Sequence, residues 1–597
     1  MCGIVACIGQ NVGDLAVSSL QRLQYRGYDS YGFAWVDDDE GRIHMRKSID
    51  SLDDIQDRLP ECTAVIGHTR WATHGGVNVE NCHPHASAEF SLVHNGIVEN
   101  YQVLKKQTCT VTYTSETDTE VIVHLLENEL QSLLAQSLLV MGDHQSELME
   151  IRRNALLAVF RQLNGRNTIV VLFADGSLMG IKDGSPLVVG KGQGKFFLGS
   201  DVLSFPDIAE FCSPMEARQL VEISNGCVSL FDENVASLAM EWSLVTPDSE
   251  VLTKEDFPHY MLKEIMEQWY MVARQATRLG PDFDKFVRAL DSCDRVLVTG
   301  AGGAYFASVQ IAWLLREVAG INALAIPAYE IESARRLFKS GDFLLAISQS
   351  GETADTIEAI EVASAWGLRI ASLVNMPMST LARMSEFSFA NHCGPEICVL
   401  STKSATAQVT FGYMLAKSIA VIADFQGDLN QLSTALSRYL CDQTSRELKN
   451  VAISIAEEEH LYILGRSGFY GAAQVAALNI KEASYIHAEA FAAGELKHGV
   501  IALVEKGVPV ILFVGKDDHY MINVAAELKS RGAHVIAIGC EDNELFDQFI
   551  LLPDVADPAL AIVAAMIPCQ LLAYHLAVVR GLNPDRPRNL AKSVTVR

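Results

Sequence analysis

A chain of 597 residues, 49% hydrophobic and 20% charged, is too long for one hydrophobic core and too apolar for a disordered protein, so several globular domains are expected. Its net charge of −26 repels phosphate backbones and argues against a nucleic-acid partner. Thirteen cysteines without a C-x-x-C pair or a secretory signal indicate reduced thiols and predict a cytoplasmic location.

Residues 1–238 are predicted to form strands and turns with a few helices. Alternating segments such as "GRIHMRK" and "TIVVLFADGSLMGIKD" favour antiparallel pairing of strands. The segment "QSLLVMGDHQSELME" (136–150) has the pattern of a helical insertion. Residues 239–283 are predicted to be a linker, because "TPDSEVLTKEDFPHY" (246–260) is polar and contains two prolines.

From residue 284 onward, short apolar strands alternate with long helical patterns. The strand pairs "RVLVTG"/"LYILG" and "RIASLV"/"HVIAIG" are each separated by 165 positions (300 to 465, and 370 to 535), which indicates an internal duplication. Each copy, 284–430 and 445–597, is predicted to form a doubly wound α/β sheet with its ligand at the carboxyl ends of parallel strands.

The longest apolar run, "PALAIVAAMIPCQLLAYHLAVV", contains Pro568, Gln570 and His575. These residues favour a buried helix pair over a membrane span, so no membrane association is expected.

Cys2 follows the initiator methionine directly, and a small side chain at this position permits removal of that methionine. The cysteine would then carry a free α-amino group with a pKa of about 7.7–8.0, which can act as the base for its own thiol. On "MCG" alone, an incidental cysteine next to a strand is the favoured interpretation. The rest of the domain favours a nucleophile.

Three further motifs carry groups that suit the hydrolysis of an amino acid amide. "GHTRWATHGG" (67–76) contains Arg70, whose planar guanidinium fits a substrate carboxylate. "HNGIVEN" (94–100) offers the Asn95 amide and the Gly96 N–H to a developing oxyanion. "TSETDTE" (114–120) contains Asp118, a carboxylate able to bind a substrate ammonium.

In the second half, polar loops follow predicted strands. In "LLAISQSGETADT" (344–356) the hydroxyl and amide side chains, with the N-terminal amides of the next helix, are able to hold a phosphate; a capped helix start is the alternative. "EICVLSTKSAT" (396–406) is a second such loop. "SYIHAEAFAAGELKHG" (484–499) brings many ionisable groups together, and "RPRNLAKSVTVR" ends the chain.

The motifs "MCGIV", "LQYRGYDS", "GHTRWATHG", "HNGIVEN" and "SETDTEVI" resemble the N-terminal-nucleophile glutamine amidotransferase domain, which implies an αββα fold for 1–238. "SQSGETADT", the 484–499 segment and "RNLAKSVTV" resemble tandem sugar isomerase domains. Their order resembles the glutamine–fructose-6-phosphate aminotransferase (isomerising) family over nearly the whole chain.

This resemblance implies the residue roles, with glutamine and a sugar phosphate as substrates, no cofactor or metal, and a homodimer. The catalytic residues would be Cys2, Asn95, Gly96, Glu482, His498 and Lys592. Glutamine would be bound by Arg70, Trp71, Thr73, His74 and Asp118. The sugar phosphate would be bound by Ser348, Gln349, Ser350, Thr353, Val399 and Ala591.

Within these roles, the resemblance makes Cys2 the nucleophile and Lys592 the Schiff-base lysine. Glu482 would move the proton between C1 and C2, and His498, from the neighbouring subunit, would assist ring opening. Trp71 and the C-terminal tail would gate an ammonia channel.

The chain departs from the family pattern at five positions. Gly303 and Ala304 stand where a Thr-Ser pair is usual, Asn479 replaces a lysine, Val475 replaces a glutamate, and Leu400 replaces a smaller residue. Fructose 6-phosphate is the first acceptor to consider, and the alternative is a paralogue that aminates another phosphosugar or lacks complete isomerase activity. A sugar-phosphate-sensing regulator and a phosphoribosyl-type amidotransferase are further alternatives. The first predicts loss of Cys2 or Lys592, and the second predicts an acidic pyrophosphate loop; neither feature is found.

Overall fold

The computed structural model describes residues 2–37, 41–55, 58–108, 111–137, 144–245, 253–421 and 425–595. The chain divides into two compact units, Met1–Glu250 together with Ala591–Arg597, and Val251–Leu590. The units are called the first unit and the second unit below, and each is described by itself.

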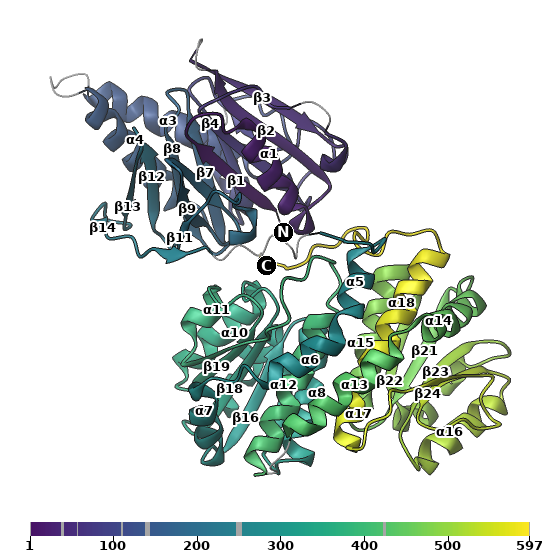
Figure 1. The fold of residues 1–597 in the computed structure, drawn as a ribbon. Helices are drawn as coiled ribbons and strands as arrows, with labels where there is room; N and C mark the ends of the chain where they lie inside the picture. Colours follow the sequence, from purple (N-terminus) through teal and green to yellow (C-terminus); the bar gives the residue numbers. More distant parts are fainter. Residues whose placement is uncertain are drawn as a thin grey trace. The chain divides into compact units, whose positions relative to one another are not determined.

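Two antiparallel sheets form the centre of the first unit (Figure 1). One sheet has the strand order β15 (Ser243–Leu244), β11 (Phe211–Pro214), β9 (Val188–Gly192), β10 (Lys195–Gly199), β1 (Gly3–Ile8), β4 (Ala64–Arg70), β2 (Ser30–Asp37), β3 (Arg42–Ser48). The other has the order β14 (Ser237–Leu238), β13 (Cys227–Phe231), β12 (Leu220–Ser224), β8 (Leu178–Asp183), β7 (Asn167–Phe173), β6 (Phe90–Gly96), β5 (His85–Ala86). The antiparallel pairing predicted for "TIVVLFADGSLMGIKD" is confirmed as the β7–β8 pair.

Successive side chains along a strand point to opposite faces of the sheet, so alternate residues pack against different layers. In β1, Ile4 and Ala6 are buried between the two sheets, while Val5 and Cys7 are buried against α1 (Gly13–Arg22). On the outer face of the other sheet, α3 (Glu120–Ser137) and α4 (His144–Phe160) contribute to one hydrophobic core with β6, β7 and β8. The layers are therefore helix, sheet, sheet, helix, as predicted.

The predicted insertion at 136–150 falls between α3 and α4. Residues 136–137 end α3 and residues 144–150 begin α4, so both flanks are helical. Residues 138–143 lie outside the described residues.

The segment predicted as a linker, 239–283, differs from that expectation within the second unit. It contains α5 (Tyr260–Met266), α6 (Gln268–Ala276) and the start of α7 (Pro281–Asp291), whose apolar faces are buried in the main core. The two described prolines of this segment do not interrupt these helices, because Pro281 occupies the first turn of α7 and Pro258 precedes α5. Residues 246–252 lie outside the described residues, and the remaining domain boundaries stay predictions.

Two five-stranded parallel sheets with the same strand order form the second unit. The first contains β17 (Ala323–Pro327), β16 (Arg295–Gly300), β18 (Asp342–Ser348), β19 (Arg369–Val374) and β20 (Phe387–Ala390) in that order. The second contains β22 (His487–Ala492), β21 (His460–Gly465), β23 (Pro509–Val514), β24 (His534–Gly539) and β25 (Gln548–Leu551). Gly300 and Gly465 end equivalent strands, which confirms the internal duplication.

Helices fill the space between these two sheets (Figure 1). The central ones, which contact one another, are α8 (Gly303–Glu317), α12 (Lys403–Ile419), α15 (Gly468–Ser484) and α18 (Met566–Val579). The remaining α-helices of the unit are α9 (Ile331–Ala334), α10 (Ala354–Ala365), α11 (Thr380–Met384), α13 (Phe425–Tyr439), α14 (Asp442–Ile455), α16 (His519–Lys529) and α17 (Pro558–Ala564).

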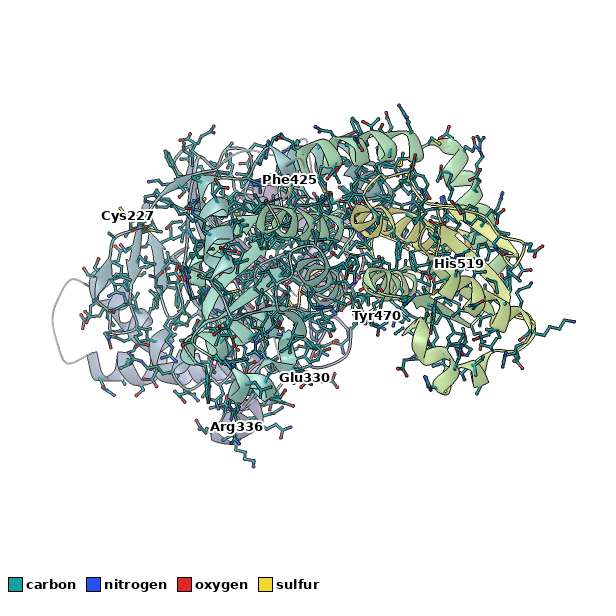
Figure 2. The ribbon with its side chains drawn as sticks, turned by 90° about the horizontal axis from the view of Figure 1, so that it is seen from below. Cys227, Glu330, Arg336, Phe425, Tyr470 and His519 are labelled. Carbon is teal, nitrogen blue, oxygen red and sulfur yellow. The ribbon has the colours of Figure 1, made fainter. Side chains whose placement is uncertain are left out.

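The span Pro558–Val579 is long and apolar enough to cross a membrane, but 89% of its most apolar window is buried inside the protein. It forms α17 and α18, so the predicted buried helix pair is confirmed. Charged side chains such as Glu330 and Arg336 instead project from the surface (Figure 2).

Candidate functional site

The Cys2 side chain lies at the start of β1, where neighbouring strands fix the backbone. The Gly3 N–H donates to Thr69 Oγ1 at 3.1 Å and the Ile4 N–H donates to Ser200 Oγ at 2.9 Å. Cys2 Sγ is half-buried and accepts a hydrogen bond from the Trp71 N–H at 3.3 Å. Burial raises the pKa of the Cys2 thiol, while the Trp71 N–H and the Arg70 guanidinium act in the opposite direction. A base must therefore remove the thiol proton near neutral pH.

Asn95 and Gly96 end β6 close to Cys2. Asn95 is 2% exposed, and its Nδ2 donates to the Cys2 carbonyl and to Ser200 Oγ, each at 3.0 Å. Gly96 has a φ of +147°, and a Cβ there would meet the Arg166 carbonyl oxygen at 2.3 Å. Only glycine fits this conformation and space.

Arg70 ends β4, 3% exposed, with its guanidinium turned toward the loop that follows. It donates to the carbonyl oxygens of His74 at 2.5 Å, Gly76 at 3.0 Å and Gly75 at 3.2 Å. The His74 ring packs edge-on against Tyr101. The guanidinium thus holds the loop after β4 in place.

The other predicted glutamine-binding residues lie on the same side of the unit. Trp71 is half-buried and Thr73 is exposed in the loop after β4, which is held by the Ala72 N–H donating to Asp29 Oδ2 at 2.8 Å. Asp118 is 4% exposed and accepts the Val98 N–H at 2.7 Å, two residues beyond Gly96.

Sequence reasoning missed four supporting side chains: Asp29, His68, Thr69 and Ser200. The first three lie inside motifs that were singled out, so proximity in sequence was an available signal. Ser200 follows β10, 105 positions from Asn95, and no local pattern marks it.

In the second unit, the predicted phosphate loop follows β18 where the strand order reverses between β16 and β18. Ser348 Oγ accepts the Gly351 N–H at 3.0 Å and lies 3.2 Å from Thr353 Oγ1. Gly351 has a φ of +64°, and a Cβ there would meet Ser379 Oγ at 2.0 Å. The tight turn aims the loop, including Gln349 and Ser350, at the N-terminus of α10, where backbone N–H groups favour an anion.

The loop bearing Val399 is held by buried carboxylates. Glu264 on α5 accepts the backbone N–H groups of Ile397 and Cys398, and Glu396 accepts those of Thr402 and Ser404. Val399 is 8% exposed, and its N–H donates to the Asp585 carbonyl at 3.4 Å.

Position 303 lies at the start of α8, beside this loop. A Cβ on Gly303 would lie 3.5 Å from Ser401 Cβ and 3.9 Å from Leu478 Cδ2 on α15, which is ordinary van der Waals contact. The loop after β16, the 399–404 loop and α15 therefore converge, and the space at Gly303 accepts a larger side chain.

The remaining positions are distributed over α15 and the segment after it. Asn479 and Val475 are each 1% exposed on α15, and Glu482, one turn from Asn479, is half-buried. Leu400 is fully buried. His498 ends the 3₁₀ helix η7 (Ala493–His498) and is exposed on the chain.

The C-terminal tail groups with the first unit. Ala591 and Lys592 are half-buried, and Thr595 Oγ1 lies 3.0 Å from Ser185 Oγ. Lys592 therefore belongs to a different unit from the loops that contain Ser348 and Val399.

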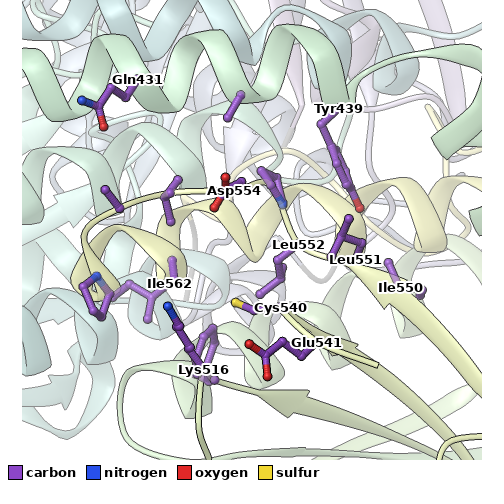
Figure 3. Close-up of a pocket in the computed structure, with 18 of the residues that line it drawn as sticks. Gln431, Tyr439, Lys516, Cys540, Glu541, Ile550, Leu551, Leu552, Asp554 and Ile562 are labelled. Carbon is purple, nitrogen blue, oxygen red and sulfur yellow. The ribbon is translucent and has the colours of Figure 1, made fainter. Parts of the chain in front are cut away.

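A cavity of about 1540 Å³ lies at the carboxyl ends of β21, β23, β24 and β25 (Figure 3). Its wall includes Arg466, Lys516, Glu541 and Asp554. In the described part of the chain, none of the predicted sugar-phosphate residues lines it. Five of them end or follow strands of the other parallel sheet, and Ala591 lies in the tail.

Comparison with known proteins accounts for both halves of the chain. A family model described as "Glutamine amidotransferases class-II" matches residues 26–189, and one described as "SIS domain" matches 289–418 and 454–580. Proteins named glutamine–fructose-6-phosphate aminotransferase [isomerizing] are similar over the full length of both chains, 34% identical in Pyrococcus horikoshii and 35% in Caulobacter vibrioides.

A solved structure gives the same picture for the second half. The C-terminal domain of glucosamine-fructose-6-phosphate aminotransferase from Francisella tularensis is 30% identical, with a TM-score of 0.52, and covers 56% of this chain and 100% of that one. The chain belongs to the isomerising glutamine–fructose-6-phosphate aminotransferase family.

Proposed function

We propose that this enzyme transfers the amide nitrogen of glutamine to fructose 6-phosphate and isomerises the product to glucosamine 6-phosphate, releasing glutamate. The observation that carries the proposal is the grouping of Cys2, Asn95, Gly96 and Arg70 in one unit of a chain that matches this family along its whole length. The phosphate loop after β18 supplies the second substrate site.

Hydrolysis of glutamine begins at Cys2. After removal of Met1, the α-amine takes the thiol proton, and the thiolate attacks the side-chain carbonyl carbon of glutamine. The oxyanion is held by Asn95 Nδ2 and the Gly96 N–H, ammonia leaves with one added proton, and water hydrolyses the thioester to glutamate. Arg70 binds the α-carboxylate of glutamine and Asp118 its ammonium, with Trp71, Thr73 and His74 completing the pocket.

Amination takes place on the ketose. Ser348, Gln349, Ser350 and Thr353, with the backbone of Val399 and Ala591, bind the sugar phosphate. His498 from the neighbouring subunit assists ring opening, Lys592 forms an imine with C2, and Glu482 moves the proton between C1 and C2. Trp71 and the tail keep ammonia from bulk water on its way to the imine. A homodimer in the cytoplasm is part of the same proposal.

A second candidate, amination of a different ketose phosphate, is favoured by the altered pocket residues. Gly303 and Ala304 lack hydroxyls and Asn479 lacks a positive charge, whereas the phosphate loop keeps its side chains. Loss of two hydroxyl donors weakens recognition of a sugar by about 1–3 kcal/mol where nothing replaces them.

The deciding experiment is mass analysis of the products formed from amide-¹⁵N glutamine and a panel of ketose phosphates. Incorporation of ¹⁵N into a hexosamine phosphate from fructose 6-phosphate supports the first candidate, and incorporation only from another ketose supports the second. The triple variant Gly303→Thr, Ala304→Ser, Asn479→Lys should use fructose 6-phosphate better than the natural sequence. An unchanged kcat/KM would contradict the role given to these three positions.

Two chemical tests address the residues. Cys2→Ala should abolish glutamine hydrolysis without unfolding the protein, and intact mass of active enzyme should show that Met1 has been removed. Borohydride added with the correct ketose phosphate should attach the reduced sugar to the peptide that contains Lys592. Retention of Met1, or an adduct on another peptide, would reject the corresponding assignment.

A further inference from the structure

His68 lies in the middle of β4, fully buried, and faces the end of β6 across the two sheets. Its Nε2 atom is 3.1 Å from the His94 carbonyl oxygen and 3.1 Å from Asn95 Oδ1. It therefore contacts the amide that the proposed reaction uses as an oxyanion donor, on the side away from Cys2.

Main-chain carbonyls determine which atom donates in each of these contacts. The His94 carbonyl can only accept, so His68 Nε2 must carry a hydrogen. The Cys2 carbonyl can only accept, so the Asn95 atom facing it is Nδ2, and the atom facing His68 is Oδ1. The Nε2–H of His68 is thus shared between two acceptors.

We propose that His68 is a positioning residue for glutamine hydrolysis, because its Nε2–H holds the Asn95 amide with Nδ2 toward the nucleophile; the inference rests on the glutaminase function proposed above. In the structure both hydrogens of Nδ2 are engaged, with the Cys2 carbonyl and Ser200 Oγ. One of them must leave its acceptor to face the oxyanion. If it leaves the Cys2 carbonyl, the amide is held by Ser200 and His68 alone. A hydrogen bond to Oδ1 also polarises the amide and makes Nδ2 a stronger donor.

The surroundings of His68 keep its imidazole neutral, as this role requires. Nδ1 is buried and has no hydrogen-bond partner among the residues that the structure describes, so a second proton would be unpaired. The ring stacks on His83 with centroids 4.1 Å apart. Burial lowers the pKa of His68 to about 3. The positive charge of Arg70 acts in the same direction, and the hydrogen bonds to His94 and Asn95 act against it.

The test compares three variants of the full chain by glutamine hydrolysis without a sugar acceptor. The amide nitrogen of glutamine reaches the place of imidazole Nε2, whereas that of asparagine reaches only the place of Nδ1. His68→Leu and His68→Asn should therefore lose at least tenfold in kcat with KM within about threefold of wild type, and His68→Gln should recover most of the loss. His85→Gln, in the same buried histidine cluster without contact to Asn95, is the packing control.

A double-mutant cycle with Asn95→Ala separates positioning from general damage. In the Asn95→Ala background, His68→Leu should cost less than about twofold further, because the group it positions is absent. An aldehyde analogue of glutamine, which forms a tetrahedral adduct with the thiol, should bind His68→Leu more weakly by the same factor as the loss in kcat, while glutamate affinity stays unchanged.

The outcomes are distinguishable. Equal losses of kcat in His68→Gln and His68→Asn would overturn the role of His68. So would a loss of kcat by His68→Leu in the Asn95→Ala background as large as in the wild-type background. Both outcomes would leave the glutaminase function standing. A loss in His85→Gln as large as in His68→Leu would assign the effect to packing and overturn it too. Wild-type protein that neither hydrolyses glutamine nor binds the aldehyde would reject the glutaminase function, and the role of His68 with it.

Discussion

At position 96 the backbone itself is part of the site. Gly96 has a φ of +147°, and the hydrogen that replaces a Cβ lies against the Arg166 carbonyl oxygen. Any side chain at position 96 would collide with this main-chain oxygen. Unlike the end of a flexible side chain, a main-chain atom cannot move aside.

We expect Gly96→Ala to destabilise the first unit by roughly 2–4 kcal/mol and to abolish glutamine hydrolysis, because backbone strain and a main-chain clash add together. Thermal unfolding and a glutaminase assay measure the two effects. Gly76→Ala is the matched control, since a Cβ at that position meets nothing within 4 Å. Equal tolerance of both substitutions would show that β6 ends differently from the structure.

Strands β4 and β6 together bury several histidines whose environment opposes a positive charge. Burial lowers the pKa of His68 and of His85 to about 3, and also lowers those of His83 and His94. These strands are therefore stable only while the imidazoles stay neutral.

The first unit should lose stability in mild acid. In the unfolded chain the imidazoles bind protons near pH 6.5, but His68 and His85 in the folded chain do so only near pH 3. Stability is thus complete above pH 6.5 and falls as the pH drops toward 3, by up to about 1.4 kcal/mol per pH unit for each histidine. Hydrogen exchange of β4 and β6 amides, corrected for intrinsic rates, measures this between pH 7.5 and 5.

His85→Gln should remove one histidine's share of that slope. An unchanged slope in this variant would assign the acid sensitivity to other groups. The effect of Glu120 on acid stability can be separated from that of the histidines. Burial raises its pKa, but hydrogen bonds from Thr114 and Ser115 outweigh burial and lower the pKa to about 2. Its contribution to stability is therefore lost only below about pH 4.5.

Helix α5 supports the sugar-phosphate loops through one buried carboxylate. Glu264 is 2% exposed and accepts the N–H groups of Ile397 and Cys398. Both N–H groups donate to the same oxygen, Oε1, so Glu264→Gln keeps an acceptor for them but removes the negative charge that strengthens both bonds. We expect a loss of about 2–4 kcal/mol in stability of the second unit and a raised KM for the sugar phosphate, with glutamine hydrolysis unchanged. Glu386→Gln, which alters an exposed ion pair with Arg369, is the control. A KM that stays at the wild-type value would separate α5 from the binding loop.

The sequence pattern predicted those strands whose pattern depends on residues close to one another in the chain. The alternation in β7 and β8 and the 165-residue offset of the parallel strands follow from side chains within a few positions of one another. Polar groups joined across long separations were not predictable: Ser200 meets Asn95 over 105 positions, and His68 meets it across two sheets. The helices within 239–283 were missed because that stretch is polar and contains prolines. This pattern predicts a linker, and it does not distinguish prolines that precede helices from prolines that break them.

At the scale of the whole molecule, the proposed division of labour between subunits can be tested by complementation. His498 is exposed on its own chain, as a residue that serves a neighbouring site must be. Co-expressed His498→Ala and Lys592→Ala chains should recover about a quarter of wild-type activity, because half the dimers are mixed and each mixed dimer has one intact site. Each variant alone should be inactive. No recovery in confirmed mixed dimers would place both residues of a site on one chain.

The tail joins the first unit although residues 251–590 of the second unit separate the two along the chain. Thr595 lies against Ser185 across 410 positions. This contact can form only after Thr595 has been synthesised, so the first unit acquires it only after the chain of the second unit is made. The order of synthesis thus delays completion of the first unit until the second has been made.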